Sequence, residues 1–179
     1  MSHHLLFGFD EQLARWACDK IPWAQYHSGM KAVGVSTGDG PDAQLLAVVT
    51  YHGYNAPLMI DGREWYNTVE MGIASSSPRW ATRRTITNLL NVAFTGYKVR
   101  KVRLLCPSTN KRAIRFAEGI GFTPEGTLRH EYAKNVHACV LGLLRNEFER
   151  PDFLKRKKRA AKRSRQPDGQ QVAVSTASA

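Results

Sequence analysis

The chain has 179 residues, 42% of them apolar and 9% aromatic, which fits one folded domain with an ordinary core and a short extension. Its formal charge is +11, yet the run between Lys155 and Arg165 supplies eight basic residues and no acidic residue. The rest of the chain carries only +3, so the charge does not indicate a nucleic-acid-binding fold outside this run.

The cysteines and histidines do not form the pattern of a metal site or a disulfide framework. Cys18, Cys106 and Cys139 are widely spaced and odd in number, which predicts reduced thiols in a cytoplasmic protein. The six histidines include no pair at zinc-binding helical spacing, so we expect no metal. No apolar stretch approaches 18 residues and no export signal is recognisable, which predicts a protein without a membrane span.

The N-terminal part predicts a helix and then a loop. Residues 10–20 have an amphipathic pattern that places Leu13, Trp16 and Ala17 on the inner face. Residues 23–29 follow as a loop of aromatic and polar residues.

Three strands are predicted next. Residues 30–37 and 44–51 are rich in valine and leucine and are separated by the turn residues 38–42, which predicts an antiparallel hairpin. Residues 64–74 alternate in the manner of a third strand, in which Glu70 is an isolated carboxylate.

A serine-rich loop, residues 75–84, leads into a helix with one apolar face. That face consists of Ile86, Leu89, Leu90, Ala93 and Tyr97. The unpaired amides and the dipole at the start of a helix favour an anion, so this junction is suited to binding phosphate.

A strand, a cap, a helix and a glycine follow in order. Residues 99–105 form an apolar strand that Pro107 ends. The candidates for the helix cap are Ser108, Thr109 and Asn110. The apolar positions at helical spacing are Ala113, Ile114, Ala117 and Ile120. Gly121 then stands where a left-handed C-terminal cap is needed, with Phe122 behind it.

Residues 123–132 and 136–144 are predicted to form the last two strands, and no periodic pattern of apolar residues continues beyond them. We therefore expect a folded domain over residues 1–152 and a basic, disordered tail over residues 153–179. The tail is either a solubilising terminus or a contact for RNA or DNA.

The order of residues around the last helix resembles the C-terminal half of the GNAT N-acetyltransferase fold. It is closest to the branch that acetylates ribosomal-protein and other N-terminal amines. The compact chain also resembles phage-encoded acetyltransferases. The matching positions are Asn110, Ala113, Gly121, Phe122, Glu125, Gly126 and Arg129. The resemblance implies one α/β domain, with a mixed sheet, splayed central strands and flanking helices. It also implies acetyl-coenzyme A as cofactor and a primary amine as acceptor, with a protein N-terminal amine as the first choice.

The same resemblance implies a set of site residues. Catalytic roles fall to Glu70 as general base, to Asn110 and to Tyr132. Coenzyme contacts fall to Met71, Ile73, Arg79, Trp80, Ala81, Thr82, Arg83, Arg84, Asn110, Ala113 and Phe116. Three positions depart from the family: Ser76 stands at the basic position of the phosphate loop, Arg79 replaces its first glycine, and Ala117 replaces a tyrosine that serves the leaving thiolate.

The altered phosphate loop leaves two interpretations open. Either Arg79, Arg83 and Arg84 compensate by binding phosphates directly, or the fold has lost its coenzyme. The alternative function is DNA adenine modification or nucleic-acid binding on a GNAT scaffold, as in phage proteins of the Mom type. A non-catalytic binding module is the third possibility, and the oligomeric state is not indicated.

Overall fold

The structure, a computed structural model, describes residues 3–21, 23–54, 58–60, 63–65 and 67–154. The chain forms a seven-stranded sheet in the order β1-β2-β3-β6-β7-β9-β8, and a separate two-stranded hairpin, β4-β5. Neighbouring strands are antiparallel except for β6 and β7, which are parallel. The expected mixed α/β sheet with flanking helices is therefore confirmed.

The bounds of the elements are as follows. The strands are β1 (His4–Leu6), β2 (Lys31–Ser36), β3 (Leu45–His52), β4 (Leu58–Ile60), β5 (Arg63–Trp65), β6 (Thr68–Ser75), β7 (Lys101–Pro107), β8 (Thr123–Ala133) and β9 (Val136–Leu144). The helices are α1 (Asp10–Lys20), α2 (Arg83–Asn91), α3 (Lys111–Gly119) and α4 (Arg145–Phe148), with a 3-10 turn at Pro78–Trp80 and a π-helical turn at Val92–Gly96.

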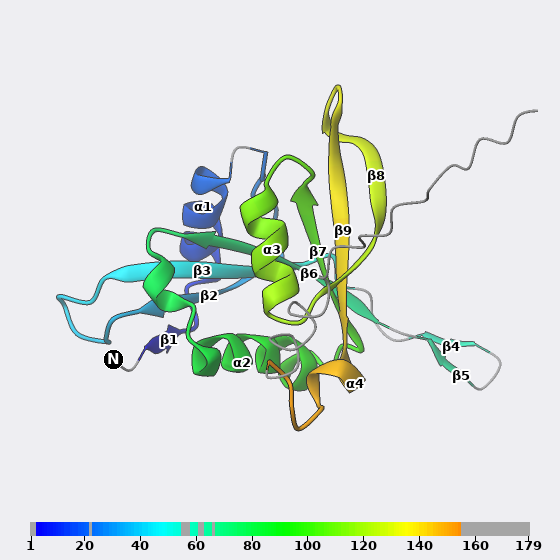
Figure 1. Cartoon of the computed structure of the whole chain (residues 1–179). Helices are drawn as coiled ribbons and strands as arrows, with labels where there is room; N and C mark the ends of the chain where they lie inside the picture. Colours follow the sequence, from blue (N-terminus) through cyan, green and yellow to red (C-terminus); the bar gives the residue numbers. More distant parts are fainter. Residues whose placement is uncertain (1–2, 22, 55–57, 61–62, 66, 155–179) are drawn as a thin grey trace, which may run out of the picture.

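The helices cover the two faces of the sheet. On one face, α1 buries Leu13, Ala14 and Ala17 against Ala32 of β2 and Val48 of β3. On the other face, α2 and α3 pack on a larger core cluster that includes side chains of β3, β6, β7 and β9. Figure 1 shows α3 lying across the central strands, with the long β8-β9 hairpin rising beside it and β4-β5 projecting from the domain.

The helix predicted at residues 10–20 is α1, with the same bounds, and the predicted hairpin is β2-β3. The inward position expected for Trp16 is only partly right. The Trp16 ring is half-buried, and the Lys20 ammonium lies 4.6 Å from its centroid. The smaller Ala14 is fully buried instead.

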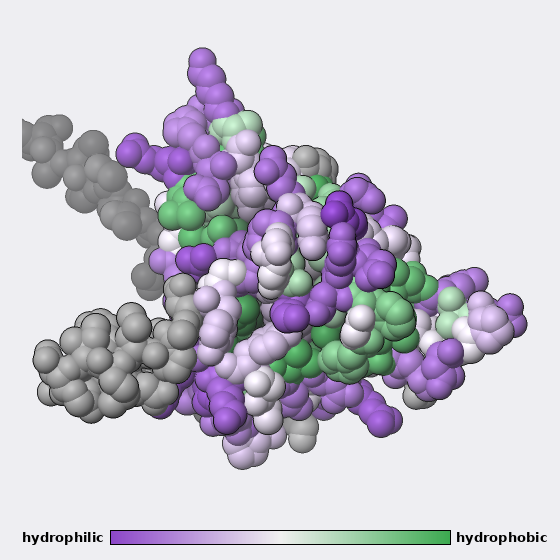
Figure 2. All heavy atoms as spheres, turned by 180° about the vertical axis from the view of Figure 1, so that it is seen from behind, coloured by the Kyte–Doolittle hydropathy of each residue, from purple (hydrophilic) through white to green (hydrophobic). Residues whose placement is uncertain are grey.

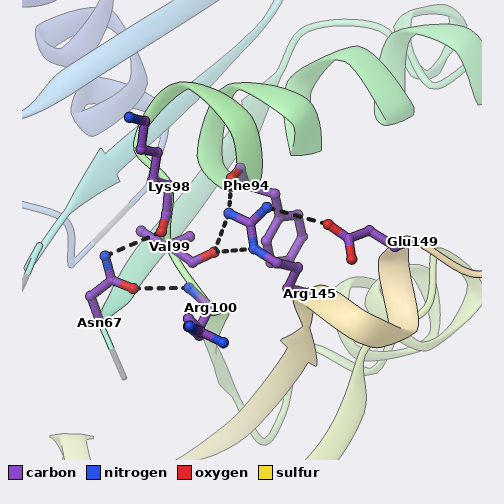
Figure 3. A network of polar contacts seen from close by, with 7 residues as sticks. All are labelled: Asn67, Phe94, Lys98, Val99, Arg100, Arg145 and Glu149. Atoms are coloured by element: carbon purple, nitrogen blue, oxygen red, sulfur yellow. Dashed lines mark hydrogen bonds and ion pairs between the residues drawn. The ribbon is translucent and has the colours of Figure 1, made fainter. Parts of the chain in front are cut away.

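The strand predicted over residues 64–74 is wrong in its first part, because the structure divides it. β5 ends at Trp65 and β6 begins at Thr68, and the physical reason is Asn67. Its buried side chain accepts a hydrogen bond from the Arg100 amide at 3.0 Å and donates one to the Lys98 carbonyl at 3.3 Å, as Figure 3 shows. These bonds tie the start of β6 to the loop before β7.

The end of α3 follows the sequence prediction. Gly121 has φ +114°, and the Phe122 amide donates to the Ala117 carbonyl at 3.1 Å. A Cβ atom on Gly121 would lie 2.7 Å from the Phe153 ring, so this position needs glycine for its conformation and for its space.

The first two residues of the predicted tail have contacts with the domain. Phe153 and Leu154 pack against the main core cluster, and the Phe153 ring lies 5.0 Å from that of Phe148. The expected disorder of the basic tail concerns residues 155–179, which lie outside the described residues.

The surface is largely hydrophilic, as the space-filling view in Figure 2 shows for the face opposite to that of Figure 1. The large apolar side chains that are most exposed are Phe7, Phe9, Trp23, Tyr54, Leu128 and Leu144. Within the described part of the chain, none of the helices is long and apolar enough to cross a membrane.

Candidate active site

The two central strands diverge, and this divergence is the main feature of the site. β6 and β7 pair at only three positions, the last joining Glu70 and Arg103. Beyond this rung β6 continues to Ser75 beside β3, and β7 continues to Pro107 beside β9. Extended backbone that lacks a strand partner offers its N–H and C=O groups to a ligand between the strands. The expected splayed strands are thus confirmed.

An apolar pocket lies over the diverging part of β6. Met71 and Ile73, two of the predicted coenzyme residues, line it together with Trp80, Ile86 and Ile120. Trp80 is 4% exposed, and its ring lies 5.7 Å from that of Phe116. The ring of Trp80 belongs to the core, so the coenzyme contact predicted for Trp80 would have to be made by its backbone.

The loop before α2 is held by two side-chain caps. Ser77 Oγ accepts a hydrogen bond from the Arg79 amide at 3.3 Å, and Thr82 Oγ1 accepts one from the Thr85 amide at 3.2 Å. The amides of Arg83 and Arg84, in the first turn of α2, have no partner position within the helix.

Three arginine side chains surround this helix start. Arg79, Arg83 and Arg84 are exposed, whereas Ala81 is half-buried and packs against the core. A helix N-terminus with several guanidinium groups has the donor set that a phosphate requires. The substitution of arginine for the family glycine at position 79 therefore adds a cation without breaking the loop.

Asn110 has a structural role in the structure. It is the N-cap of α3, and its Oδ1 accepts a hydrogen bond from the Ala113 amide at 3.1 Å. The catalytic role expected for Asn110 has no further support from its contacts. Ala113 and Phe116 are half-buried on the same helix, and Ala117 is 1% exposed in the core, where a tyrosine side chain would not fit without repacking.

A row of polar side chains crosses three strands at the point of divergence. His52 of β3 is the cross-strand partner of Glu70 of β6, which is in turn the partner of Arg103 of β7. Glu70 Oε2 lies 2.8 Å from Arg103 Nη2, and Glu70 Oε1 lies 3.8 Å from His52 Nε2. The ring of His27, from the loop after α1, stands edge-on to His52 at 5.5 Å.

The electrostatics of this row favour a neutral imidazole at position 52. Burial lowers the pKa of His52, the Glu70 carboxylate opposes this, and the charges of His27 and Arg103 lower the pKa further. Arg103 Nε is buried and has no hydrogen-bond partner among the described residues. Sequence reasoning missed His52 and Arg103, because only the strand register brings them to Glu70.

Tyr132 reaches the same region from β8. Burial raises the pKa of Tyr132 to about 12, with further contributions from Cys106, Glu70 and Glu131. Its ring lies 5.4 Å from that of Trp23, so the predicted aromatic loop borders the site. A phenol that holds its proton so firmly is suited to donate a hydrogen bond and poorly suited to protonate a thiolate of ordinary pKa, ~8.5.

Cys106 and Cys139 are cross-strand partners on β7 and β9. Burial is the main cause that raises the pKa of Cys106 to about 11, and the neighbouring Cys139 contributes to the same rise. Cys106 is therefore a protonated, weakly reactive thiol. No group of three or more potential metal ligands comes together within the described residues.

No family model and no curated protein matches this chain. Solved structures do match. A chimera of the Vibrio cholerae spermidine N-acetyltransferase SpeG with hSSAT superposes with a TM-score of 0.64 at 16% identity, covering 84% of this chain and all of the other. The Vibrio cholerae spermidine N-acetyltransferase in complex with CoA and spermine gives 0.60 at 15% identity, covering 83% and 98%. A structure described as a putative acetyltransferase gives 0.51 at 19% identity, covering 68% and 60%.

The chain therefore has the fold of the GNAT N-acetyltransferases. These neighbours do not support the expected N-terminal branch, because two are spermidine N-acetyltransferases by name and the third is described only as a putative acetyltransferase. Identities of 14–19% carry the fold alone, so activity, coenzyme and acceptor belong to the proposal that follows.

Proposed function

We propose that this protein is an acetyl-coenzyme A dependent N-acetyltransferase that acts on a primary amine. The observation that carries the proposal is the divergence of β6 and β7 directly beyond Glu70 and Arg103. The slot between the strands has unpaired backbone on the β6 side and a polar row at its closed end. An extended acyl donor and an amine can meet in such a slot.

The residues present fit the coenzyme in two respects. The exposed Arg79, Arg83 and Arg84 at the start of α2 can pair with phosphates. The backbone of β6 from Met71 to Ile73, which no longer pairs with β7, can hydrogen-bond an extended pantetheine arm. When bound, the coenzyme supplies a thioester whose acetyl group is transferred.

A protein N-terminal amine remains the acceptor that we propose. The only carboxylate in the polar row, Glu70, is already paired with Arg103, and His27 and His52 stand next to it. A polyamine carries several positive charges and gains little attraction from a single carboxylate that is already neutralised by an arginine. A single ammonium group is compatible with this charge distribution. The exposed Trp23 and its neighbour Tyr132 can contact the side chain that follows a terminal amine.

Calorimetric titration of acetyl-coenzyme A into the full chain tests coenzyme binding. We expect micromolar affinity, weakened by about fivefold or more in Arg79→Glu, because an exposed ion pair contributes up to ~1 kcal/mol. Arg150→Glu, at an exposed arginine beyond α4, is the charge-matched control and should bind like the wild type. Absence of binding by the wild type would refute the proposal.

An acceptor screen tests the finer statement. The protein is incubated with acetyl-coenzyme A and one of three acceptors: peptides with free N-termini, the same peptides with blocked N-termini, or spermidine. The acetylated products are identified and quantified by mass spectrometry. Acetylation of free N-termini at a higher kcat/KM than spermidine supports our choice. A preference for spermidine overturns the N-terminal assignment and leaves the acetyltransferase intact.

The nucleic-acid alternative rests on the basic run between Lys155 and Arg165, which lies outside the described residues. It stays a prediction from the sequence. Analysis of nucleosides from DNA of expressing cells checks it, since modification activity requires an altered adenine.

A further inference from the structure

The polar row contains two groups that can accept a proton, and their surroundings differ. Glu70 is 17% exposed in its side chain and makes a 2.8 Å charged hydrogen bond with Arg103. The Oε2 atom of Glu70 is occupied by the Arg103 guanidinium, so this oxygen would have to give up its charged hydrogen bond before it could take a proton from an amine. Its position on the last shared rung of β6 and β7 also fixes its orientation.

His52 is placed differently. Its side chain is 24% exposed, and the distance of 3.8 Å from Nε2 to Glu70 Oε1 exceeds hydrogen-bond length. No hydrogen bond engages the imidazole within the described residues, so the lone pair of its neutral form is available. His52 also ends β3, on the same face of the sheet as Glu70, so a group entering from the side of the loop after α1 meets it first.

From this geometry we propose that His52 is the proton acceptor for the incoming amine, and that Glu70, held by Arg103, is a positioning residue that stabilises the imidazolium once it forms. The inference rests on the acetyl-transfer function proposed above. It replaces Glu70, the base that the family resemblance implies, with a residue on the neighbouring strand.

The proton balance is complete with these groups. The neutral imidazole takes one proton from the ammonium group, and the amine nitrogen then attacks the carbonyl carbon of the thioester. The C–N bond forms, the C–S bond breaks, and the second proton of the nitrogen ends on the departing sulfur. The imidazolium returns its proton to solvent.

The groups that face His52 set the direction of each expected pH effect. Glu70 on β6 raises the pKa of His52, while burial, His27 in the loop after α1 and Arg103 on β7 lower it. Glu70→Gln removes the only opposing charge, so the acid limb of the pH profile should move to lower pH in this variant. If Glu70 were the base, the limb would instead rise to the pKa of the amine in Glu70→Gln and stay near its wild-type position in His52→Gln.

The size of the defect in His52→Gln depends on the amine offered. At pH 7 about one in eleven α-amines of pKa ~8 is neutral, against about one in 2,500 alkyl amines of pKa ~10.4. Loss of the proton acceptor should therefore lower kcat/KM about tenfold for a peptide N-terminus and far more for an alkyl amine. Both defects should shrink as the pH approaches 9, which a merely structural change would not produce.

The experiment measures kcat/KM from pH 5.5 to 9 for the wild type, His52→Gln, Glu70→Gln and the control His4→Gln, whose imidazole lies on β1. We expect the acid limb to rise to the pKa of the amine, ~8 for a peptide N-terminus, only in His52→Gln, to move to lower pH in Glu70→Gln and to keep its position in His4→Gln. An active wild type whose acid limb keeps its position in His52→Gln overturns this inference alone. A wild type that acetylates no amine overturns it together with the proposed function.

Discussion

Arg145 is the side chain whose loss we expect to destabilise the domain most clearly without touching the site. It lies at the start of α4, where β9 ends, and donates hydrogen bonds to the carbonyls of Phe94 and Val99. The Val99 carbonyl receives two of them, at 3.2 Å from Nε and 3.0 Å from Nη2. Figure 3 shows the guanidinium joining the end of the π-helical turn to the strand entry, with Glu149 on its outer side.

The magnitude follows from the carbonyls that Arg145→Met would leave unpaired. Phe94 and Val99 are 1% and 0% exposed, so water reaches them poorly once the guanidinium is gone. Each orphaned buried acceptor costs about 1–3 kcal/mol, and because the arginine itself is partly exposed the lower part of the range applies, roughly 2–4 kcal/mol in total. Against a typical stability of about 5–15 kcal/mol, this loss is readily measured.

Arg15→Met is the matched control. Like Arg145, Arg15 forms an ion pair with a glutamate four residues away, Glu11, and lies over an aromatic ring, that of Tyr26. Within the described residues its side chain donates hydrogen bonds to the exposed Glu11 carboxylate and to no buried carbonyl. Exposed pairs of this kind contribute about 0.2–1 kcal/mol, so the control should lose less than ~1 kcal/mol.

Urea unfolding of the full chain, followed by tryptophan fluorescence, compares the two variants. The prediction requires Arg145→Met to lower the free energy of unfolding by clearly more than Arg15→Met, with similar dependence on denaturant. Equal losses in the two variants would show that the carbonyl contacts contribute nothing and would refute the reasoning.

Two further predictions concern stability. A Cβ atom on Gly121 would lie 2.7 Å from the Phe153 ring and would be strained at φ +114°, so Gly121→Ala should cost about 1–3 kcal/mol through overpacking, while Gly126→Ala, which meets open space, should cost nothing comparable in the same unfolding assay. Burial raises the pKa of Asp10, but a hydrogen bond from the Ala32 amide and a neighbouring lysine outweigh it and lower the pKa. The resulting stability is present above the ordinary pKa of ~3.9 and is lost as the pH falls through the folded-state value, so Asp10→Asn should flatten the acid side of the stability profile. An unchanged profile would contradict this assignment.

The elements that the sequence predicted well are those fixed by local chemistry. The helix over residues 10–20 has an amphipathic period, and α3 has an asparagine cap and a terminal glycine with φ +114°. Each of these signals depends on residues a few positions apart. The cap of α3 is Asn110, one of the three cap candidates that the sequence offered.

The features that the sequence did not predict depend on partners far along the chain. Asn67 interrupts the expected long strand because it bonds to a loop about 30 residues later. The row of His52, Glu70 and Arg103 requires the register of three strands, and alternation alone leaves that register open. Trp80 matched a family position in the sequence, but its burial became visible only in the packed fold.

The alternation of side chains explains why the proposed site can keep its two substrates apart. Glu70 and Met71 are consecutive on β6, so they point to opposite faces of the sheet. Met71 faces the apolar pocket beside α2, whereas Glu70 faces His52 and the loop after α1. In the proposed reaction the thioester therefore approaches from the face of α2 and α3, and the amine from the face of α1. They can meet only between β6 and β7, immediately beyond the rung where the two strands part, which places the proton acceptor on the amine's side of the sheet.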